Sequence, residues 1–247
     1  MGVSDCSDIV GVLGGMGPAA TLDFLHKMLE ATPARSDQEH VPVLVASIPQ
    51  VPDRTAAFRG EGDSPLPALL ASGRRLAEGG AGVLVMPCNT AHLWFDALQS
   101  ALGLPMLHLV DAALAEAVAL AGPAARIGLL ATDATSAAAL YPNRTPAGSA
   151  LQWVMPTAGE MLDAVMPGIA AVKAGDHARG GALLQRAADA LARRGAQALV
   201  LGCTEIPLVL DAERSPLPLI DATAALARRA VAWSLARRAG AAVAIAD

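Results

Sequence analysis

An internal repeat constrains the fold of this chain more than any other feature of its sequence. Residues Leu76–Cys88 align with Leu191–Cys203 at a constant offset of 115 residues, and seven of the aligned positions are identical. Two further pairs align in the same order at offsets of 117 and 113 residues: Ile9–Gly14 with Arg126–Ala131, and Leu104–Leu107 with Leu217–Ile220. The sequence therefore predicts two copies of one structural unit.

Each copy has the pattern of an α/β unit. Its apolar runs are four to six residues long and do not alternate with polar residues, which is typical of strands covered on both faces. Helical segments separate these runs, and that order favours right-handed βαβ connections in a parallel sheet. The expected strands are Ile9–Leu13, Val43–Ser47 and Gly82–Met86 in the first copy, and Arg126–Ala131, Leu151–Met155 and Ala198–Leu201 in the second.

The predicted fold is thus α/β, with two pseudo-symmetric parallel-sheet domains. The last helical segment, about Thr223 to Ala239, is expected to return to the first copy. Residues 1–107 and 219–247 would then form the first domain, and residues 108–218 the second. Residues 50–67 are rich in Pro and Gly, so we predict a long loop there, and long loops in compact domains are usually functional.

Charge and composition exclude several classes of partner. The net charge is −5, from 18 Lys and Arg against 23 Asp and Glu, so the basic excess of a nucleic-acid-binding protein is missing. Three Phe, three Trp and one Tyr are too few for base-stacking surfaces. The apolar runs are too short for a membrane span, and the polar, acidic start of the chain is unlike a signal peptide. We expect a cytoplasmic protein.

Cysteine and lysine usage argues against a disulfide framework and against common cofactors. Cys6, Cys88 and Cys203 are far apart in the sequence and odd in number. Cys88 and His92 are four residues apart, but two ligands do not make a closed metal site. Only two lysines are present, and neither lies in a sequence suited to the phosphate of pyridoxal phosphate. No metal and no cofactor is expected.

Polar residues follow the predicted strands, at the edge of an open α/β sheet where ligands bind. Cys88 and Cys203 occupy equivalent positions of the repeat, each after a strand and before an expected helix start, whose positive dipole end favours a thiolate. Small polar side chains with adjacent backbone amides can hold a carboxylate. Those that follow the strands are Asn89, Thr90, Thr132 and Thr204.

A matched pair of thiols has a definite chemical use. Racemisation at a carbon atom needs a base that removes a proton from one face and an acid that returns a proton to the other face. Equivalent cysteines from two facing halves would supply both groups. The alternative is that each cysteine is a small buried apolar residue, which is a common environment for free cysteine. Their equivalence in the repeat favours the catalytic interpretation.

Six segments carry a resemblance to a known family. They read GGMGPAAT (14–21), RSDQEH (35–40), PQVPDRT (49–55), MPCNTAH (86–92), VKAG (172–175) and GCTE (202–205). In this order they resemble the aspartate racemase family, the cofactor-independent members of the aspartate/glutamate racemase superfamily. The resemblance spans nearly the whole chain and includes both Cys88 and Cys203.

The resemblance implies an active site in the cleft between two α/β domains, usually in a homodimer. It implies that one of Cys88 and Cys203 deprotonates the substrate Cα and the other reprotonates it, without pyridoxal phosphate or metal. By the pattern of the family, Cys88 would deprotonate the D-form and Cys203 the L-form. The implied substrate-binding residues are Met16, Arg54, Asn89, Thr90, Thr132, Lys173 and Thr204.

Two basic residues have a second interpretation. The resemblance implies that Arg54 and Lys173 supply positive charge for a substrate carboxylate and for the thiolate. Without it, Arg54 would be a solvated loop charge and Lys173 a cation at a helix C-terminus. Several other polar residues are not assigned to catalysis: Glu39 and His40 as loop or dimer-contact residues, and His92, His108 and His177 as structural histidines.

The expected substrate is aspartate, with other substrates left open. Glutamate racemases usually carry Asp-Ser after the first strand and Gly-Cys-Thr-His at the second cysteine. Gly14–Gly15 and Gly202–Glu205 differ from both motifs, which favours the aspartate branch. A glutamate racemase or a broad-specificity amino-acid racemase of the same superfamily is the alternative.

Two other classes of function stay open. Residues 15–20, GMGPAA, fit the glycine pattern of an NAD-type dinucleotide-binding protein, but no acidic residue ends the next expected strand, Val43–Ser47. A protein that binds an amino acid without turning it over is the second alternative. A small amino acid is the expected ligand in the racemase interpretation and in this one.

Overall fold

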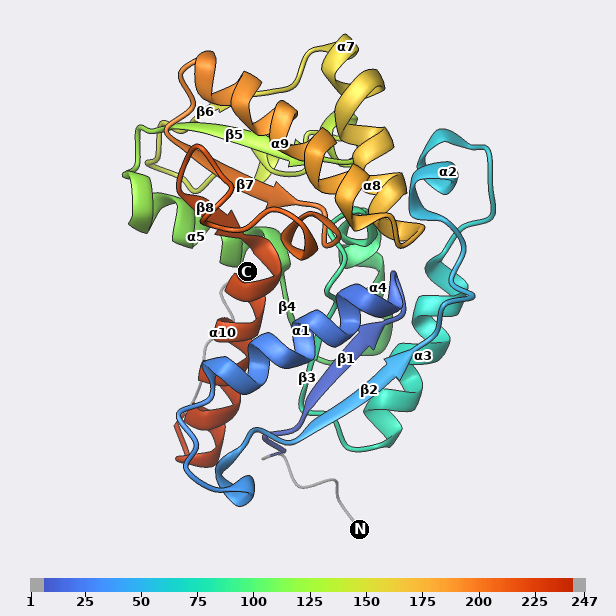
Figure 1. The fold of residues 1–247 in the computed structure, drawn as a ribbon. Helices are drawn as coiled ribbons and strands as arrows, with labels where there is room; N and C mark the ends of the chain where they lie inside the picture. The colour runs from blue at the N-terminus through green and yellow to red at the C-terminus, as the bar shows by residue number, and fades with distance from the viewer. Residues whose placement is uncertain (1–6, 242–247) are drawn as a thin grey trace. The chain divides into compact units, whose positions relative to one another are not determined.

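The computed structural model describes residues 7–241, which form two compact units. One unit holds the described residues up to Leu109 and those from Thr223 on, and the other holds Val110–Ala222. Each contains a four-stranded parallel sheet with flanking helices (Figure 1). The predicted α/β class with two parallel-sheet halves is confirmed. The division into domains 1–107 with 219–247 and 108–218 stays a prediction.

The first unit has the strand order β2-β1-β3-β4, with β1 buried along its whole length. Helix α3 contacts β1 and β2, and α4 packs on α3. The elements are β1 (Val10–Gly14), α1 (Pro18–Ala31), β2 (Val43–Ser47), α2 (Arg54–Arg59), α3 (Leu66–Glu78), β3 (Val83–Val85), α4 (Phe95–Leu102), β4 (Met106–Leu107) and, from the end of the chain, α10 (Ala222–Arg238).

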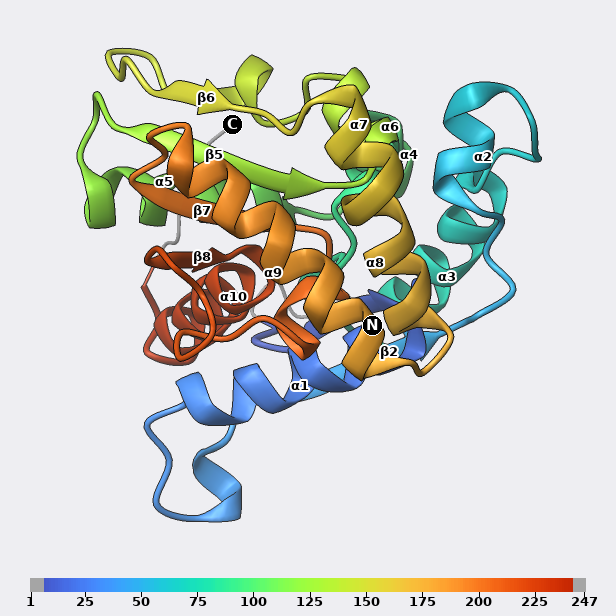
Figure 2. The same ribbon diagram turned by 45° about the horizontal axis from the view of Figure 1, so that its top comes forward.

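The second unit repeats this order as β6-β5-β7-β8. Figure 2 shows β5 and β7 as neighbouring arrows with α9 beside them, and α9 packs on α8 and on β5. The elements are α5 (Leu109–Ala121), β5 (Arg126–Ala131), α6 (Asp133–Ala137), β6 (Gln152–Val154), α7 (Ala158–Glu160), α8 (Met166–Lys173), α9 (His177–Arg193), β7 (Ala198–Gly202) and β8 (Leu219–Asp221). Residues Met161–Val165 form a π-helical turn between α7 and α8.

The repeated sequence positions form the same packing motif in each unit. A Cβ atom placed on Gly11 of β1 would lie 2.6 Å from Leu84 Cδ2 and 2.8 Å from Ala81 Cβ. In the second unit a Cβ atom on Gly128 of β5 would lie 2.5 Å from the corresponding leucine, Leu199, at its Cδ2. Each glycine therefore lets a central strand lie against the leucine of its neighbour strand, and this explains why these positions recur.

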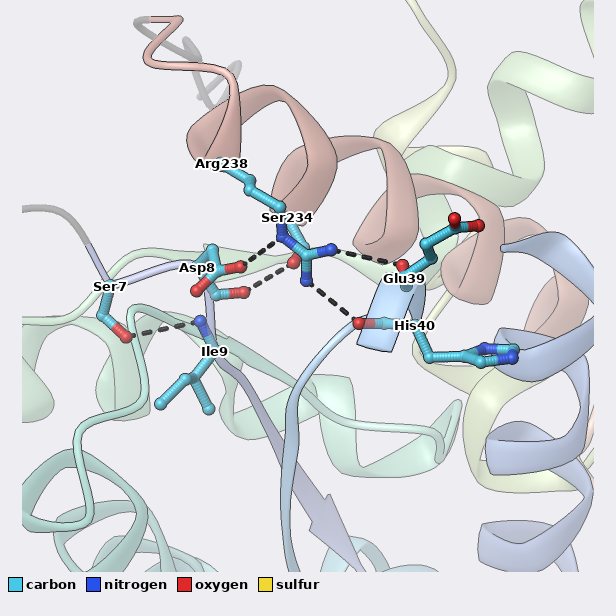
Figure 3. A network of polar contacts seen from close by, with 7 residues as sticks. All are labelled: Ser7, Asp8, Ile9, Glu39, His40, Ser234 and Arg238. Atoms are coloured by element: carbon cyan, nitrogen blue, oxygen red, sulfur yellow. Dashed lines mark hydrogen bonds and ion pairs between the residues drawn. The ribbon is translucent and has the colours of Figure 1, made fainter. Parts of the chain in front are cut away.

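Helix α10 belongs to the first unit although it follows the last strand of the second. Ser234 Oγ donates to the Asp8 carbonyl at 2.6 Å, and Arg238 Nε pairs with the Asp8 carboxylate at 2.9 Å. Arg238 also donates to the carbonyls of Glu39 and His40 at 3.2 and 3.0 Å (Figure 3). The expected return of the last helix to the first half is thus observed. No helix in residues 7–241 is both long and apolar enough to span a membrane.

Two local predictions need correction. Residues 50–67 are not one continuous loop, because they contain α2 and the start of α3. The Asp53 side chain caps α2 by accepting from Ala56 N at 2.8 Å, and Gly60, one of the glycines that suggested a loop, ends the helix in a left-handed conformation. The short strands β4 and β8 were not predicted.

Candidate active site

Seven of the nine candidate residues lie in two groups, one in each unit, at the carboxyl ends of neighbouring parallel strands; Arg54 instead begins helix α2, and Lys173 ends helix α8. In the first unit Met16 follows β1 and Cys88 follows β3, and these strands are paired. In the second unit Thr132 follows β5 and Cys203 follows β7, which are also paired. The order of the sheets therefore brings the predicted residues of each half to one sheet edge.

The turn after β1 is built tightly against β2. Gly15 has φ +91°, and a Cβ atom there would lie 2.4 Å from the backbone nitrogen of Ile48. The Gly15 N–H donates to Thr21 Oγ1 at 2.8 Å, and Thr21 Oγ1 donates to the Gly17 carbonyl at 3.0 Å. Met16 is buried in the same apolar cluster as Cys88. Gly15 thus has a packing reason that does not depend on a dinucleotide.

Cys88 is buried, and its backbone is held by His92. The His92 Nε2 atom accepts from the Leu109 N–H at 3.1 Å, so its proton is on Nδ1, which donates to the Cys88 carbonyl at 2.8 Å. The His92 ring stacks on Phe95, and His108 packs edge-on against it. His92 therefore fixes the turn that carries the thiol, and a structural role for His92 and His108 stays a prediction.

Arg54 begins helix α2, which contacts the segment Thr90–Trp94 that follows Cys88. Its guanidinium is half-buried and donates through Nη1 to the carbonyls of Val51 at 3.4 Å and Pro52 at 3.2 Å. Its Nε is buried with no hydrogen-bond partner. Arg54 is therefore not a fully solvated loop charge.

Cys203 is buried next to a carboxylate. Its Sγ donates to Glu205 Oε2 at 3.0 Å, and Thr204 Oγ1 donates to the same oxygen at 3.2 Å. All three side chains are at least nine-tenths buried. The segment after them is a single turn, Ile206–Leu208, and no α-helix begins there.

The expected α-helix start directly after each cysteine is therefore wrong, because a 3-10 segment follows both Cys203 and, at Thr90–Trp94, Cys88. Burial raises the pKa of Cys203 well above its usual value, and the nearby Glu205 carboxylate raises it further. Lys173 acts in the opposite direction and lowers this pKa, but it does not cancel the other two effects. Burial and Glu205 therefore both favour the neutral thiol of Cys203 over its thiolate.

Lys173 fits both of its interpretations. It is the last residue of α8, where a cation complements the helix dipole. It is also near enough to Cys203 to stabilise the thiolate electrostatically. Its side chain is exposed, so solvent weakens this effect.

The remaining predicted residues are buried at the strand ends. Thr132 caps α6, with Oγ1 accepting from Thr135 N at 3.2 Å and bonded to Thr135 Oγ1 at 3.0 Å. Asn89 and Thr90 are buried beside Cys88, and Thr204 is buried beside Cys203. Their positions agree with the prediction, and their role in binding stays a prediction.

Two residues near Cys203 had no role in the sequence interpretation. Glu205 is the last residue of the GCTE motif and follows Cys203 by two residues. Tyr141 is fully buried after α6, and burial, Asp221 and Cys203, in that order, raise the pKa of its hydroxyl. No sequence pattern links Tyr141 to the cysteine, because they meet only through the fold.

Other unassigned residues have simple structural places. Glu39 accepts through its carboxylate from the Arg35 N–H at 2.6 Å, and with His40 it anchors Arg238 through backbone carbonyls (Figure 3). His177 begins α9 and is exposed. Within residues 7–241 no cluster of His, Cys, Asp and Glu could hold a metal ion. Cys6 lies outside the described residues.

Comparison with known proteins agrees with this arrangement. The chain is 28% identical to the broad specificity amino-acid racemase RacX of Bacillus subtilis over 92% of its own length and 99% of that protein. It is 30% identical to a glutamate racemase of Deinococcus radiodurans over 85% of its length and 70% of that protein. The structure of Picrophilus torridus aspartate racemase superposes with a TM-score of 0.83 and 29% identity, covering 92% of this chain and 94% of that one.

The profile of one family covers both units and both cysteines. It matches residues 13–230, a range that starts in β1 and ends in α10. The glycine-rich turn after β1 lies inside this match, and β2 ends at Ser47 with no acidic residue, so the dinucleotide-binding alternative loses its support. The chain belongs to the Asp/Glu/Hydantoin racemase family.

Proposed function

We propose that this protein is an amino-acid racemase that interconverts L- and D-aspartate with two cysteines and no cofactor. The observation that carries this proposal is the pair Cys88 and Cys203. Both are free, buried and placed at equivalent strand ends of a repeated unit. Two inert core cysteines would have no reason to recur at the ligand-binding edge of both sheets.

In the proposed reaction one thiolate takes the Cα proton and the other thiol supplies a proton to the opposite face. The Cα–H bond breaks as an S–H bond forms, and the electron pair stays on Cα, delocalised into the carboxylate. The second S–H bond then breaks and its proton forms the new Cα–H bond. Each cysteine is the base for one enantiomer and the acid for the other.

The charged and polar residues of the site would hold the amino acid. Arg54, with its unpartnered Nε, is the proposed ligand of a substrate carboxylate, and Lys173 the proposed stabiliser of the Cys203 thiolate. Met16 would line the pocket. Short hydrogen-bonding side chains beside the two thiols would fix the amino acid: Asn89, Thr90, Thr132 and Thr204.

A broad-specificity racemase is the second candidate, and a specific observation favours it. Identity to the broad specificity racemase is 28%, close to the 29% shared with the aspartate racemase structure. The Gly14–Gly15 turn and the Gly202–Glu205 motif favour aspartate over glutamate. A panel of substrates therefore decides between the two candidates.

The test follows chirality and deuterium together. Purified protein is incubated in D₂O with each enantiomer of a panel of amino acids, without added cofactor. Conversion of aspartate with deuterium at Cα is the expected result, and it should survive chelators and carbonyl reagents but be lost on thiol alkylation. Binding of aspartate without any Cα exchange would support the non-catalytic alternative instead.

We also propose that the protein is a cytoplasmic homodimer. The apolar side chains of Leu22, Leu29 and Val45, on α1 and the edge strand β2, are exposed in the single chain. An uncovered edge strand with exposed apolar neighbours is a suitable surface for a second copy. Sedimentation of the purified protein tests the dimer, and a monomer at micromolar concentration would contradict it.

A further inference from the structure

We propose that Glu205 is a positioning residue that holds the proton on Cys203 Sγ, so that Cys203 enters the reaction as the proton donor. The Oε2 atom of Glu205 lies 3.0 Å from Cys203 Sγ and accepts its S–H bond. Both side chains are 5% exposed, so little water competes for that proton. This inference rests on the proposed racemase function and assigns a role to a residue outside the proposed pair of cysteines.

The orientation of the carboxylate is itself fixed. Thr204 Oγ1 donates to the same Oε2 atom at 3.2 Å, so the oxygen that accepts from the thiol also receives a hydroxyl hydrogen bond. A carboxylate in an arbitrary rotamer would not be held in this way. The sequence Cys-Thr-Glu thus forms one hydrogen-bonded unit within three consecutive residues.

The charged and titratable groups around Cys203 come from four segments of the second unit. Glu205 lies on the same turn, and its negative charge disfavours a second negative charge on the sulfur. Lys173 at the end of α8 favours the thiolate. Tyr141 after α6 is coupled electrostatically to Cys203 and to Asp221 of β8, and its hydroxyl stays neutral because its pKa is raised. Glu205 is the group that bonds directly to the sulfur.

The first copy of the repeat has no carboxylate two residues after its cysteine. In the repeat alignment Thr90 occupies the position of Glu205, so no carboxylate follows Cys88 at that spacing. A proton held on Cys203 leaves Cys88 as the base in the direction for which Cys203 is the acid, whereas the reverse direction requires that this proton first leave Cys203. Cys88 thiolate then takes the Cα proton, Cys203 S–H gives its proton to the opposite face, and Cys203 is left as the thiolate with its hydrogen bond to Glu205 lost.

Thiol titration tests the inference without relying on racemase activity. In protein carrying Cys6→Ser and Cys88→Ser, only Cys203 contributes a thiolate, and its ultraviolet absorbance is followed against pH. The single Tyr is followed separately through its tyrosinate band. We expect a midpoint above the usual cysteine value of about 8.5. Glu205→Gln should lower it by about one to three pH units, while the exposed Glu213→Gln should leave it unchanged.

Two results would overturn the inference: a midpoint at or below about 8.5 with Glu205 present, or the same midpoint in the Glu205→Gln variant. If circular dichroism shows that Glu205→Gln does not fold, the first criterion still decides. Glu205→Asp then provides a second variant, in which the shorter side chain should lower the midpoint in part. Because these titrations need no substrate, they stand even if the protein racemises nothing.

Kinetics of the full chain supply the readout that a purely structural role would not move. In the pH profile of kcat/KM, one limb reflects the ionisation of Cys203. Glu205→Gln should move this limb to lower pH for L-to-D and for D-to-L conversion, because the pKa of this thiol falls. A residue that only supports the fold would lower kcat/KM at every pH and leave the limbs in place. That second pattern would contradict the inference, and Glu205→Asp should restore part of the original profile.

Discussion

The turn after Cys88 and the turn after Cys203 share a backbone frame but differ at the sulfur. Both follow the third strand of a four-stranded sheet with the same order. His92 holds the first turn by a hydrogen bond to the Cys88 carbonyl, not to the Cys88 sulfur. Glu205 holds the second by a hydrogen bond to Cys203 Sγ itself. A repeat can therefore place two equivalent thiols while the neighbouring residues make them chemically unequal.

Replacing each thiol gives the largest expected effect. Serine has a much higher pKa than cysteine, so Cys88→Ser and Cys203→Ser should each lower racemisation by about 10²–10⁴-fold. Solvent exchange at Cα should not fall equally, because the remaining thiol can still deprotonate its own enantiomer. Following the expected assignment of faces, Cys88→Ser should keep more exchange with L-aspartate and Cys203→Ser more with D-aspartate.

These variants are measured by chiral chromatography and by deuterium incorporation. Equal loss of exchange from both enantiomers in both variants would contradict the assignment of faces. Full racemisation in either variant would exclude the two-thiol mechanism. Cys6→Ser serves as the control, since Cys6 has no assigned role.

The two basic residues should differ in the size of their effects. Arg54 is half-buried with an unpartnered Nε, so Arg54→Ala removes a charged hydrogen bond of about 1.5–3 kcal/mol and should lower kcat/KM by about 10–150-fold. Lys173 is exposed, so Lys173→Ala should lower kcat/KM less, and it should raise the pKa of Cys203. Arg59→Ala, on the same helix as Arg54, is the matched control for the arginine. Near-normal kinetics in either test variant would return that residue to a surface role.

The sequence predicts the core of the fold well because its signals there are local and repeated. Apolar runs between helical segments identify six of the strands, with bounds that differ from the structure by at most one residue. The strands β4 and β8 were missed because two or three residues carry too little periodicity. Helix α2 was missed because six residues lie between a capping Asp and a Gly in a Pro-rich segment.

The site is predictable in position and less so in chemistry. Cys88 and Cys203 follow from the repeat, and the polar residues beside them follow from the strand ends. The state of Cys203 does not, because it depends on burial and on the side-chain rotamer of Glu205. Tyr141 lies 62 residues before Cys203 in the sequence, and only the fold brings their charges within reach.

Adding one methyl group to each of the equivalent glycines tests whether the cores of the two units are packed in the same way. Gly11→Ala and Gly128→Ala each place a Cβ atom within 2.6 Å of a buried leucine carbon. Such overpacking should lower the free energy of unfolding by about 1–3 kcal/mol, and the loss should be similar for the two variants. Gly159→Ala on α7, where a Cβ atom meets nothing within 4 Å, should be neutral or stabilising.

Denaturant unfolding followed by circular dichroism measures these changes. The midpoints of Gly11→Ala and Gly128→Ala should both fall, with the slope of the transition unchanged. A large loss for one glycine and none for the other would show that the repeat is preserved in sequence without an equivalent packing role.

The smallest expected effect concerns helix α10, which comes from the end of the chain and belongs to the first unit. Arg238 of α10 contacts two segments, at Asp8 before β1 and at the adjacent Glu39 and His40 before β2 (Figure 3). The Arg238 side chain is 37% exposed, so solvent screens its ion pair, and Arg238→Ala should cost about 0.5–1 kcal/mol. Ser234→Ala removes the hydrogen bond from the buried Ser234 hydroxyl to the Asp8 carbonyl and should cost a similar amount.

Because both residues contact the segment before β1 and not a proposed site residue in any of these bonds, kcat/KM should stay unchanged in both variants. A selective fall in kcat/KM without loss of stability would show that this anchor also controls the site.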